Sequence, residues 1–168
     1  YDRIDVLINN VGAYFAFRDV TEEGFERTFA LNHLGYFLMT KKLLNLVEES
    51  DYARIVSVSS SAHYGIDFEF DNLNGEKKYK GFDAYKKSKL ANVMFTYELA
   101  KRVKDKGITA NCLHPGFVAT KFGNNNNILW RAFISFAKLL MAISVEDGAK
   151  TSIHLACSDD VKDVTGKF

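Results

Sequence analysis

Short apolar segments alternate with longer amphipathic segments along this chain. Residues 5–9, 54–58 and 109–113 are of strand length, are rich in apolar or β-branched residues and are bounded by turn formers. Helical patterns occur at about 22–32, 35–49, 83–105 and 145–156. Strands that alternate with helices form parallel sheets covered by helices. The pattern therefore predicts an α/β fold with a doubly wound, Rossmann-like parallel sheet.

Another apolar segment, residues 128–143, follows a run of asparagines at 124–127. Its polar positions Arg131, Ser135 and Lys138 form one narrow stripe on a helix, so such a helix would bury most of its surface. The segment is shorter than the ~20 residues that span a bilayer. We expect a core helix or a substrate-side lid, with contact to a membrane surface as the alternative. We interpret the asparagine run as its mobile connection.

Composition fits one domain over residues 1–168, since 47% of the residues are hydrophobic. The net charge of +1, with acidic residues close to the lysines at 77–87, argues against nucleic acid as a partner. Cys112 and Cys157 have no CxxC spacing, and the histidines have no ligand spacing, so we expect no metal site. The cysteine usage favours an intracellular location, either cytoplasmic or associated with the endoplasmic reticulum.

Polar and turn-forming residues follow all three predicted strands. Asn9, Asn10 and Gly12 end the first strand, residues 59–61 are three serines after the second, and residues 114–120 form a turn-like segment after the third. Ligands of open parallel sheets bind beyond the carboxyl ends of the strands. The sequence therefore predicts a binding site at this edge of the sheet.

Tyr85 and Lys89 are four residues apart in a predicted helix, and so share a face. A lysine charge beneath a phenol makes the phenol easier to ionise, which suits proton transfer. Tyr97 and Lys101 repeat the spacing, but Tyr97 lies deep in an apolar helical run and is interpreted as a packing residue. Tyr85 instead follows a glycine and Asp83, a potential N-cap, so its ring can face a cleft near the helix start.

Taken together, these motifs resemble the short-chain dehydrogenase/reductases and, within them, the retinol dehydrogenase-like branch. The resemblance covers nearly the whole chain and rests on five motifs in the family's order, at residues 9–12, 31–35, 58–60, 85–89 and 114–116. The branch rests on residues 32–35, 74–77 and 88–92. The resemblance implies hydride transfer between a nicotinamide cofactor and an alcohol, or the matching aldehyde or ketone.

The resemblance also implies four catalytic residues. Tyr85 would give a proton to the substrate oxygen in reduction and accept one in oxidation, and Ser60 would donate a hydrogen bond to that oxygen. Ser59 and Ser61 remain alternatives to Ser60. Lys89 would lower the pKa of Tyr85 and hold the nicotinamide ribose. Asn32 would hold a water for proton relay, or else act as a helix-end cap; its neighbour His33 is interpreted as structural.

The implied cofactor is NADP, with NAD left open. Asn9 would lie near the adenosine, while Asn10 and Gly12 would shape the turn. Val11 departs from the usual alanine. The turn after the third strand would approach the nicotinamide. The implied cofactor-binding residues are Asn9, Asn10, Gly12, Tyr85, Lys89, Pro115, Gly116, Val118 and Thr120.

One departure from the family is large, because the chain has no glycine-rich phosphate-binding turn of the GxxxGxG or GxGxxG kind. The sequence starts where the family's fourth strand would lie and stops where a last strand should begin. We therefore expect a partial Rossmann-like fold that lacks the first three strands and the last strand.

Three functions fit these observations. The leading hypothesis is an oxidoreductase for a hydrophobic small molecule, such as a retinoid, steroid or lipid aldehyde, to which Phe117, Phe122 and Trp130 are suited. A non-catalytic fragment that acts as a binding or interaction module is the alternative, and a sugar-nucleotide epimerase fits the motifs less well. Whether the protein forms a homo-oligomer stays open.

Overall fold

The computed structural model describes residues 1–120 and 142–168, and between them Phe122, Gly123, Asn126, Ile128, Ala132, Ser135 and Leu139. Most of the apolar segment 128–143 and of the asparagine run lies outside the described residues. The same holds for Arg131, Lys138 and Trp130. The predicted lid or core helix therefore stays a prediction.

Over the described residues the sheet has three strands in the order β1-β2-β3, and their pairing is parallel, as expected. They are β1 (Val6–Asn9), β2 (Arg54–Val58) and β3 (Thr109–Leu113). Val6 lies opposite Arg54, and Arg54 lies opposite Thr109, so the three strands begin level with one another. Their carboxyl ends therefore meet at one edge of the sheet.

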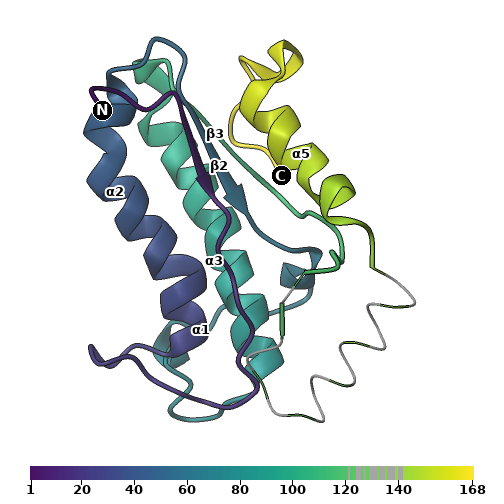
Figure 1. Cartoon of the computed structure of the whole chain (residues 1–168). Coiled ribbons are helices and arrows are strands. Elements are labelled where there is room, and N and C mark those ends of the chain that lie inside the picture. Colours follow the sequence, from purple (N-terminus) through teal and green to yellow (C-terminus); the bar gives the residue numbers. More distant parts are fainter. Residues whose placement is uncertain are drawn as a thin grey trace.

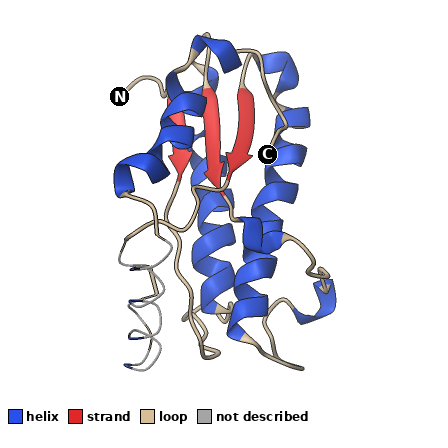
Figure 2. Cartoon of the chain, turned by 90° about the vertical axis from the view of Figure 1, so that its right-hand side faces the viewer, coloured by secondary structure: helices blue, strands red, loops and turns tan. Residues whose placement is uncertain are grey.

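Helices cover both faces of this sheet (Figure 1, Figure 2). On one face lie α2 (Gly35–Glu48) and α3 (Gly81–Arg102), and on the other lies α5 (Val145–Cys157). Successive side chains of β2 point to opposite faces of the sheet. Ile55 packs with Leu99 of α3 on one face, and Val56 belongs to the cluster that contacts Leu155 of α5 on the other. The predicted doubly wound arrangement is confirmed as a partial Rossmann-like fold.

The helical segment before β2 differs from the prediction. We expected separate helices at about 22–32 and 35–49, whereas α1 (Arg27–Phe29) continues through a π-helical turn (Ala30–Leu34) directly into α2. The buried Glu26 carboxylate accepts hydrogen bonds from the backbone N–H groups of Thr28 (2.9 Å) and Phe29 (2.7 Å), which fixes the later start. In the π turn the Gly35 N–H donates to the Ala30 carbonyl, five residues back.

Helix α3 begins at Gly81, two residues earlier than predicted, and Asp83 lies in its first turn. Lys80 takes the N-cap position without a side-chain capping bond, so the prediction that Asp83 is the N-cap is wrong. A Cβ at Gly81 would lie only 2.6 Å from the Phe15 carbonyl oxygen. The glycine therefore allows the start of α3 to pack against the segment that follows β1.

Short 3-10 turns connect the remaining elements, at Ser61–His63, Phe70–Asn72, Lys104–Lys106 and Asp159–Val161. The last residues of the chain lie beside β3, since the Gly166 N–H donates to the Ala110 carbonyl (2.8 Å) and the Cys112 N–H donates to the Lys167 carbonyl (2.9 Å). None of the helices in the described part of the chain is long and apolar enough to cross a bilayer.

Candidate active site

The four residues that the resemblance marks as catalytic converge at the carboxyl edge of the sheet. Helix α3 carries Tyr85 and Lys89, Ser60 follows β2, and Asn32 lies in the π turn. Asn32 reaches α3 through a hydrogen bond from its Nδ2 to the Ser88 Oγ (3.0 Å). Elements that are far apart in the sequence thus bring a phenol, an ammonium, a hydroxyl and an amide together.

Tyr85 lies among aromatic rings. Phe82 stacks on it with ring centroids 6.3 Å apart, Tyr14 meets it edge-on, and the Phe122 centroid is 5.5 Å away. Burial raises the pKa of Tyr85, and a hydrogen bond with Ser60 acts in the opposite direction. The net direction is the reverse of the lowering that we expected from Lys89.

The Lys89 ammonium lies between the Tyr85 ring and the end of β2. Lys89 is buried, its Nζ donates a hydrogen bond to the Val58 carbonyl (3.0 Å), and it lies 5.8 Å from the Tyr85 ring centroid. The charge is therefore held at the end of β2 and beside the ring. Burial in turn lowers the pKa of Lys89 to about 8.

The three serines after β2 make different contacts. Ser59 is buried and donates to the Lys89 backbone carbonyl (2.7 Å), whereas Ser61 is exposed at the start of a 3-10 turn. Ser60 accepts from the Ala62 N–H (3.2 Å) and acts to lower the pKa of Tyr85. Because the Ser60 Oγ accepts from the backbone, its own hydrogen is available to a neighbour, so the geometry favours Ser60 over the other two.

Asn32 uses both hydrogens of its amide within the protein. Its Nδ2 donates to the Ala13 carbonyl (2.9 Å) and to Ser88, and its Oδ1 accepts from the Ala13 N–H (2.8 Å). The side chain is fully buried. It therefore clamps the loop after β1 against α3 and has no amide hydrogen left to donate to a water.

The residues implied for the cofactor divide into two groups, and the first lies after β1. Asn9 is buried and points toward α2, where its Nδ2 donates to the Thr40 Oγ1 (3.0 Å), while Asn10 is exposed. A Cβ at Gly12 would lie 3.3 Å from the Lys89 Nζ and 3.5 Å from the Asn32 Oδ1. The glycine therefore keeps space open beside the buried ammonium.

The second group follows β3 and includes the half-buried Pro115. Gly116 has φ +85°, and a Cβ there would lie 2.9 Å from the Ile143 Cδ1, so this turn requires glycine. Val118 packs against Gly148 of α5, where a Cβ would lie 2.5 Å from the Val118 Cγ2. Thr120 is exposed and accepts from the Phe122 N–H (3.2 Å) through its hydroxyl.

The competing tyrosine, Tyr97, lies elsewhere. Its side chain is 41% exposed on α3, so it is less buried than we expected for a packing residue in an apolar helical run. The apolar run that contains it belongs to a helix with one exposed face, which also carries Met94 at 43% exposure.

Sequence reasoning missed four residues of this site. Tyr36 donates from its hydroxyl to the Val58 carbonyl (3.4 Å), and the Lys89 Nζ lies 5.9 Å from its ring centroid. Tyr14 meets Tyr85, and the His63 Nδ1 lies 2.6 Å from the Ser60 carbonyl oxygen. Asn92 bonds to the π turn. Two of them follow a helical spacing from residues already selected, because Tyr36 is four residues after Asn32 and Asn92 is three after Lys89.

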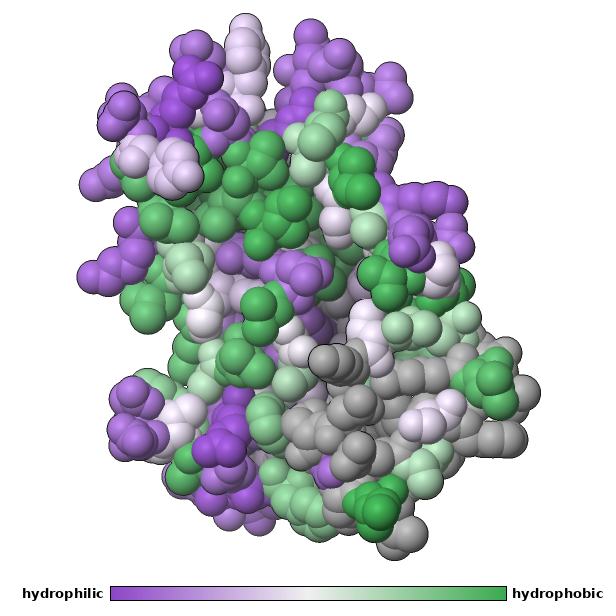
Figure 3. Space-filling model, in the orientation of Figure 1, coloured by the Kyte–Doolittle hydropathy of each residue, from purple (hydrophilic) through white to green (hydrophobic). Residues whose placement is uncertain are grey.

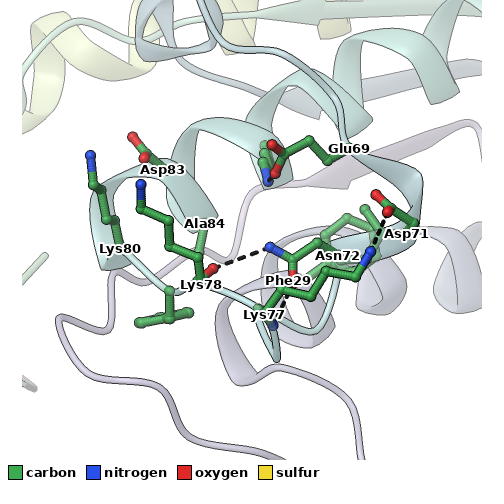
Figure 4. A pocket seen from close by; sticks show the side chains of 13 residues that line it. Phe29, Glu69, Asp71, Asn72, Lys77, Lys78, Lys80, Asp83 and Ala84 are labelled. Atoms are coloured by element: carbon green, nitrogen blue, oxygen red, sulfur yellow. Dashed lines mark hydrogen bonds and ion pairs between the residues drawn. The ribbon is translucent and has the colours of Figure 1, made fainter.

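A cavity of about 290 Å³ lies apart from these residues, between the loop at 69–80 and the face of α3 that carries Asp83, Ala84 and Lys87 (Figure 4). Its charges are largely paired, since Lys87 bonds to Glu69 and Lys77 bonds to Asp71. None of Ser60, Tyr85, Lys89 and Asn32 lines it. We therefore do not assign the substrate to this cavity.

Comparison with known proteins agrees with the fold and with the motifs. Residues 1–128 match the family described as short chain dehydrogenase, and the chain belongs to that family. It is 44% identical to retinol dehydrogenase 14 of Mus musculus over 168 residues and 40% identical to retinol dehydrogenase 12 of Homo sapiens over 169 residues. These alignments cover 99% of this chain but 50% and 52% of the relatives, so the chain spans about half the length of the curated relatives it matches.

Two solved structures share the fold. A short-chain dehydrogenase/reductase of unknown function from Caenorhabditis elegans, solved with cofactor, superimposes with a TM-score of 0.73 at 26% identity. The match covers 98% of this chain and 62% of that one. An uncharacterised protein from Mycobacterium paratuberculosis gives a TM-score of 0.72 at 32% identity, over 95% of this chain and 52% of the other.

Proposed function

We propose that the chain forms the proton-transfer side of an oxidoreductase active site that moves a hydride between a nicotinamide cofactor and a hydrophobic alcohol, aldehyde or ketone. One observation carries the proposal. Ser60 lies close enough to Tyr85 to act on the pKa of its hydroxyl, and the buried Lys89 ammonium lies 5.8 Å from the centroid of the same ring. Membership of the family and identity to retinol dehydrogenases support it.

The cofactor supplies the hydride, and the chain's own residues handle the proton. Because burial raises the pKa of Tyr85, its hydroxyl is protonated at neutral pH and can give a proton to the substrate oxygen during reduction. Ser60 donates a hydrogen bond to the same oxygen. In the oxidative direction the Lys89 charge stabilises the phenolate form of Tyr85.

Lys89 and Gly12 fit the ribose side of the cofactor. Among the residues that the structure describes, the Lys89 ammonium has one hydrogen-bond acceptor, the Val58 carbonyl, so two of its three N–H groups are available to ribose hydroxyls. The open space at Gly12 gives access to that ammonium. We propose NADP as the cofactor and keep NAD as the alternative.

The surroundings of Tyr85 suit an apolar substrate. Phe82, Tyr14 and Phe122 line the ring, and they would surround an apolar group whose oxygen meets the hydroxyl. Since the relatives named above are retinol dehydrogenases, we propose a retinoid-like alcohol or aldehyde as substrate.

The experiment measures reduction of all-trans-retinal and of aliphatic aldehydes with NADPH or NADH, by following product alcohol chromatographically. It uses both the 168-residue chain and the full-length gene product, with cofactor binding followed by calorimetry. We expect the full-length product to form alcohol in step with NADPH oxidation. If it binds neither cofactor and reduces no carbonyl compound, the proposal is wrong.

The two proteins together also test the non-catalytic alternative. If the full-length product is active while the 168-residue chain melts cooperatively but binds no cofactor, the isolated chain is a folded, inactive fragment.

A further inference from the structure

We infer that Asn92 is a positioning residue. Its amide fixes the backbone carbonyls of Asn32 and Val58, and thereby the positions of Asn32 and Lys89. His33 holds the Asn92 amide in the orientation that this requires. The structural part of this inference stands on the hydrogen bonds alone, and its effect on turnover rests on the proposed function. Asn92 touches none of the four proposed catalytic side chains directly, so it would act through its partners.

Asn92 lies in the middle of α3, with none of its surface exposed. Its Nδ2 donates to the Asn32 carbonyl (2.9 Å) and, over 3.5 Å, to the Val58 carbonyl. Its Oδ1 lies 3.1 Å from the His33 Nδ1. One side chain therefore connects the π turn, the end of β2 and α3.

The first carbonyl lies where the helix is irregular. In the π turn the backbone bond spans five residues, so the regular series of carbonyl partners is interrupted. In this buried turn the Asn32 carbonyl accepts a hydrogen bond from the Asn92 amide, and such bonds offset the cost of burying a backbone polar group. Since the Asn32 side chain clamps the loop after β1, fixing its backbone also fixes that clamp.

The second carbonyl is shared with the catalytic lysine. The Val58 oxygen accepts from the Lys89 Nζ (3.0 Å), the Tyr36 hydroxyl (3.4 Å) and the Asn92 Nδ2 (3.5 Å). Val58 is the last residue of β2 and immediately precedes the serines. Asn92 therefore shares this acceptor with Lys89 and helps to fix the position of the oxygen to which the ammonium is bonded.

The orientation of the amide follows from its partners. Both backbone carbonyls can only accept, so the Asn92 Nδ2 must face them and its Oδ1 must face His33. The His33 Nδ1 must then carry a hydrogen. The ring is held in place by Phe29, at a centroid distance of 5.0 Å, and by Phe95, at 6.1 Å. Burial lowers the pKa of His33, which favours the neutral ring, and the Asn92 Oδ1 opposite Nδ1 favours the tautomer with its hydrogen on Nδ1.

A first experiment needs no activity. Two-bond nitrogen–proton NMR spectra of the ¹⁵N-labelled 168-residue chain report which His33 nitrogen is protonated. We expect Nδ1–H in the wild type, and in Asn92→Leu we expect loss of that preference together with a shift of the Asn32 side-chain amide signals. An Nε2–H tautomer in the wild type, or Asn32 signals that do not move, would overturn the inference.

Asn111 provides the matched control. It is also a buried asparagine bonded to the backbone, with its Nδ2 on the Val164 carbonyl (2.6 Å) and its Oδ1 on the Lys167 N–H (3.1 Å). Asn111→Leu should lower stability but leave the Asn32 signals and the His33 tautomer unchanged. If it moves both as Asn92→Leu does, the effect is general loosening of the fold and the inference fails.

The kinetic experiment uses the full-length gene product. We expect Asn92→Asp, which cannot donate to either carbonyl, to lower kcat by about tenfold to a hundredfold, as displacement of catalytic groups does, with little change in cofactor affinity. His33→Leu should produce a similar loss, and His33→Asn, whose amide can donate to the same oxygen, should restore most of kcat.

Equal kcat in Asn92→Asp and the wild type would overturn the positioning role. If the wild type itself turns over no substrate, the proposed function fails, and the inference is then decided by the NMR outcomes.

Discussion

At the scale of single residues, the buried position of Lys89 favours its proposed role beside Tyr85 but lowers the stability of the folded chain. Within the part of the protein that the structure describes, the Lys89 ammonium has one hydrogen-bond acceptor, a neutral carbonyl, and burial lowers its pKa from the ordinary value of 10.5 to about 8. This difference destabilises the folded chain by about 3 kcal/mol at pH 7. A residue of this kind is expected where a protein uses the charge.

Replacing Lys89 by methionine should therefore stabilise the chain at neutral pH. The loss of the bond to Val58 offsets part of the gain, which leaves about 2 kcal/mol and a melting temperature raised by about 5 °C. As pH rises from about 8 toward 10.5, folded Lys89 loses its proton before unfolded Lys89 does, so wild-type stability rises relative to the variant. The advantage of Lys89→Met should shrink over this range.

Urea denaturation of both proteins at pH 7, 8, 9 and 10 measures this difference. A variant that is less stable than the wild type by the same amount at every pH would show that Lys89 is not destabilising in the fold.

At the scale of elements, the start of α3 depends on a glycine in an unusual setting. In an ordinary helix, replacing glycine by alanine adds stability of about 0.5–1 kcal/mol. At Gly81 the added Cβ would meet the carbonyl oxygens of Phe15 (2.6 Å) and Ala16 (2.7 Å), both in backbone that cannot move aside without shifting Tyr14. The destabilisation caused by these close contacts should exceed the stabilisation that alanine gains from its higher helix propensity.

We therefore expect Gly81→Ala to lower the free energy of unfolding by about 1–2 kcal/mol. Gly35→Ala is the matched control, because Gly35 is exposed, has helical φ and ψ, and its Cβ would lie 3.6 Å from the Ala30 carbonyl, an ordinary contact. That variant should be neutral or more stable by up to about 1 kcal/mol. Chemical denaturation distinguishes them, and equal effects of the two substitutions would refute the tight contact at Gly81.

The strands could be predicted from the sequence, because Ile55, Val56 and Val58 lie in a short apolar segment between turn formers. The helix boundaries could not be predicted in the same way. The start of α1 at Arg27 depends on the Glu26 carboxylate, and the hydroxyl of Tyr79, from another part of the chain, donates to that carboxylate (3.1 Å). The π turn at Ala30–Leu34 could not be predicted either, because it is too short to change the spacing of apolar residues in the sequence.

In the candidate active site, too, some features could be predicted from the sequence and others depend on tertiary contacts. Tyr85 and Lys89 could be selected from their spacing and context, and resemblance added Ser60 and Asn32. The direction of the pKa shift of Tyr85 could not be predicted, because it depends on tertiary burial against Tyr14, Phe82 and Phe122.

At the scale of the whole molecule, one edge of the sheet is apolar and exposed. In the described part of the chain, β1 is an edge strand, and Val6 and Ile8 are 37% and 43% exposed. Figure 3 shows hydrophobic surface over the region where β1 and α2 lie in Figure 1, and α2 adds the exposed Phe37 and Leu38. Exposed edge strands with apolar flanks promote association.

We therefore expect the 168-residue chain to self-associate as its concentration rises, and Ile8→Lys to suppress this by placing a charge on the edge strand. Ile153→Lys is the control, because Ile153 is also exposed, at 58%, but lies on α5. Light scattering coupled to size-exclusion chromatography measures the mass. A wild-type chain that is monomeric at all concentrations, or equal suppression by both variants, would contradict this prediction.

The proposed reaction depends on Tyr85 as the proton donor and acceptor, and kcat of Tyr85→Phe in the full-length gene product tests this role most directly. We expect carbonyl reduction to fall by about a hundredfold or more while cofactor affinity is retained, because only the transferable proton is removed. Tyr97→Phe, which changes the exposed tyrosine of the same helix, should leave turnover intact. Unchanged turnover in Tyr85→Phe, or a comparable loss in Tyr97→Phe, would contradict the proposed role of Tyr85.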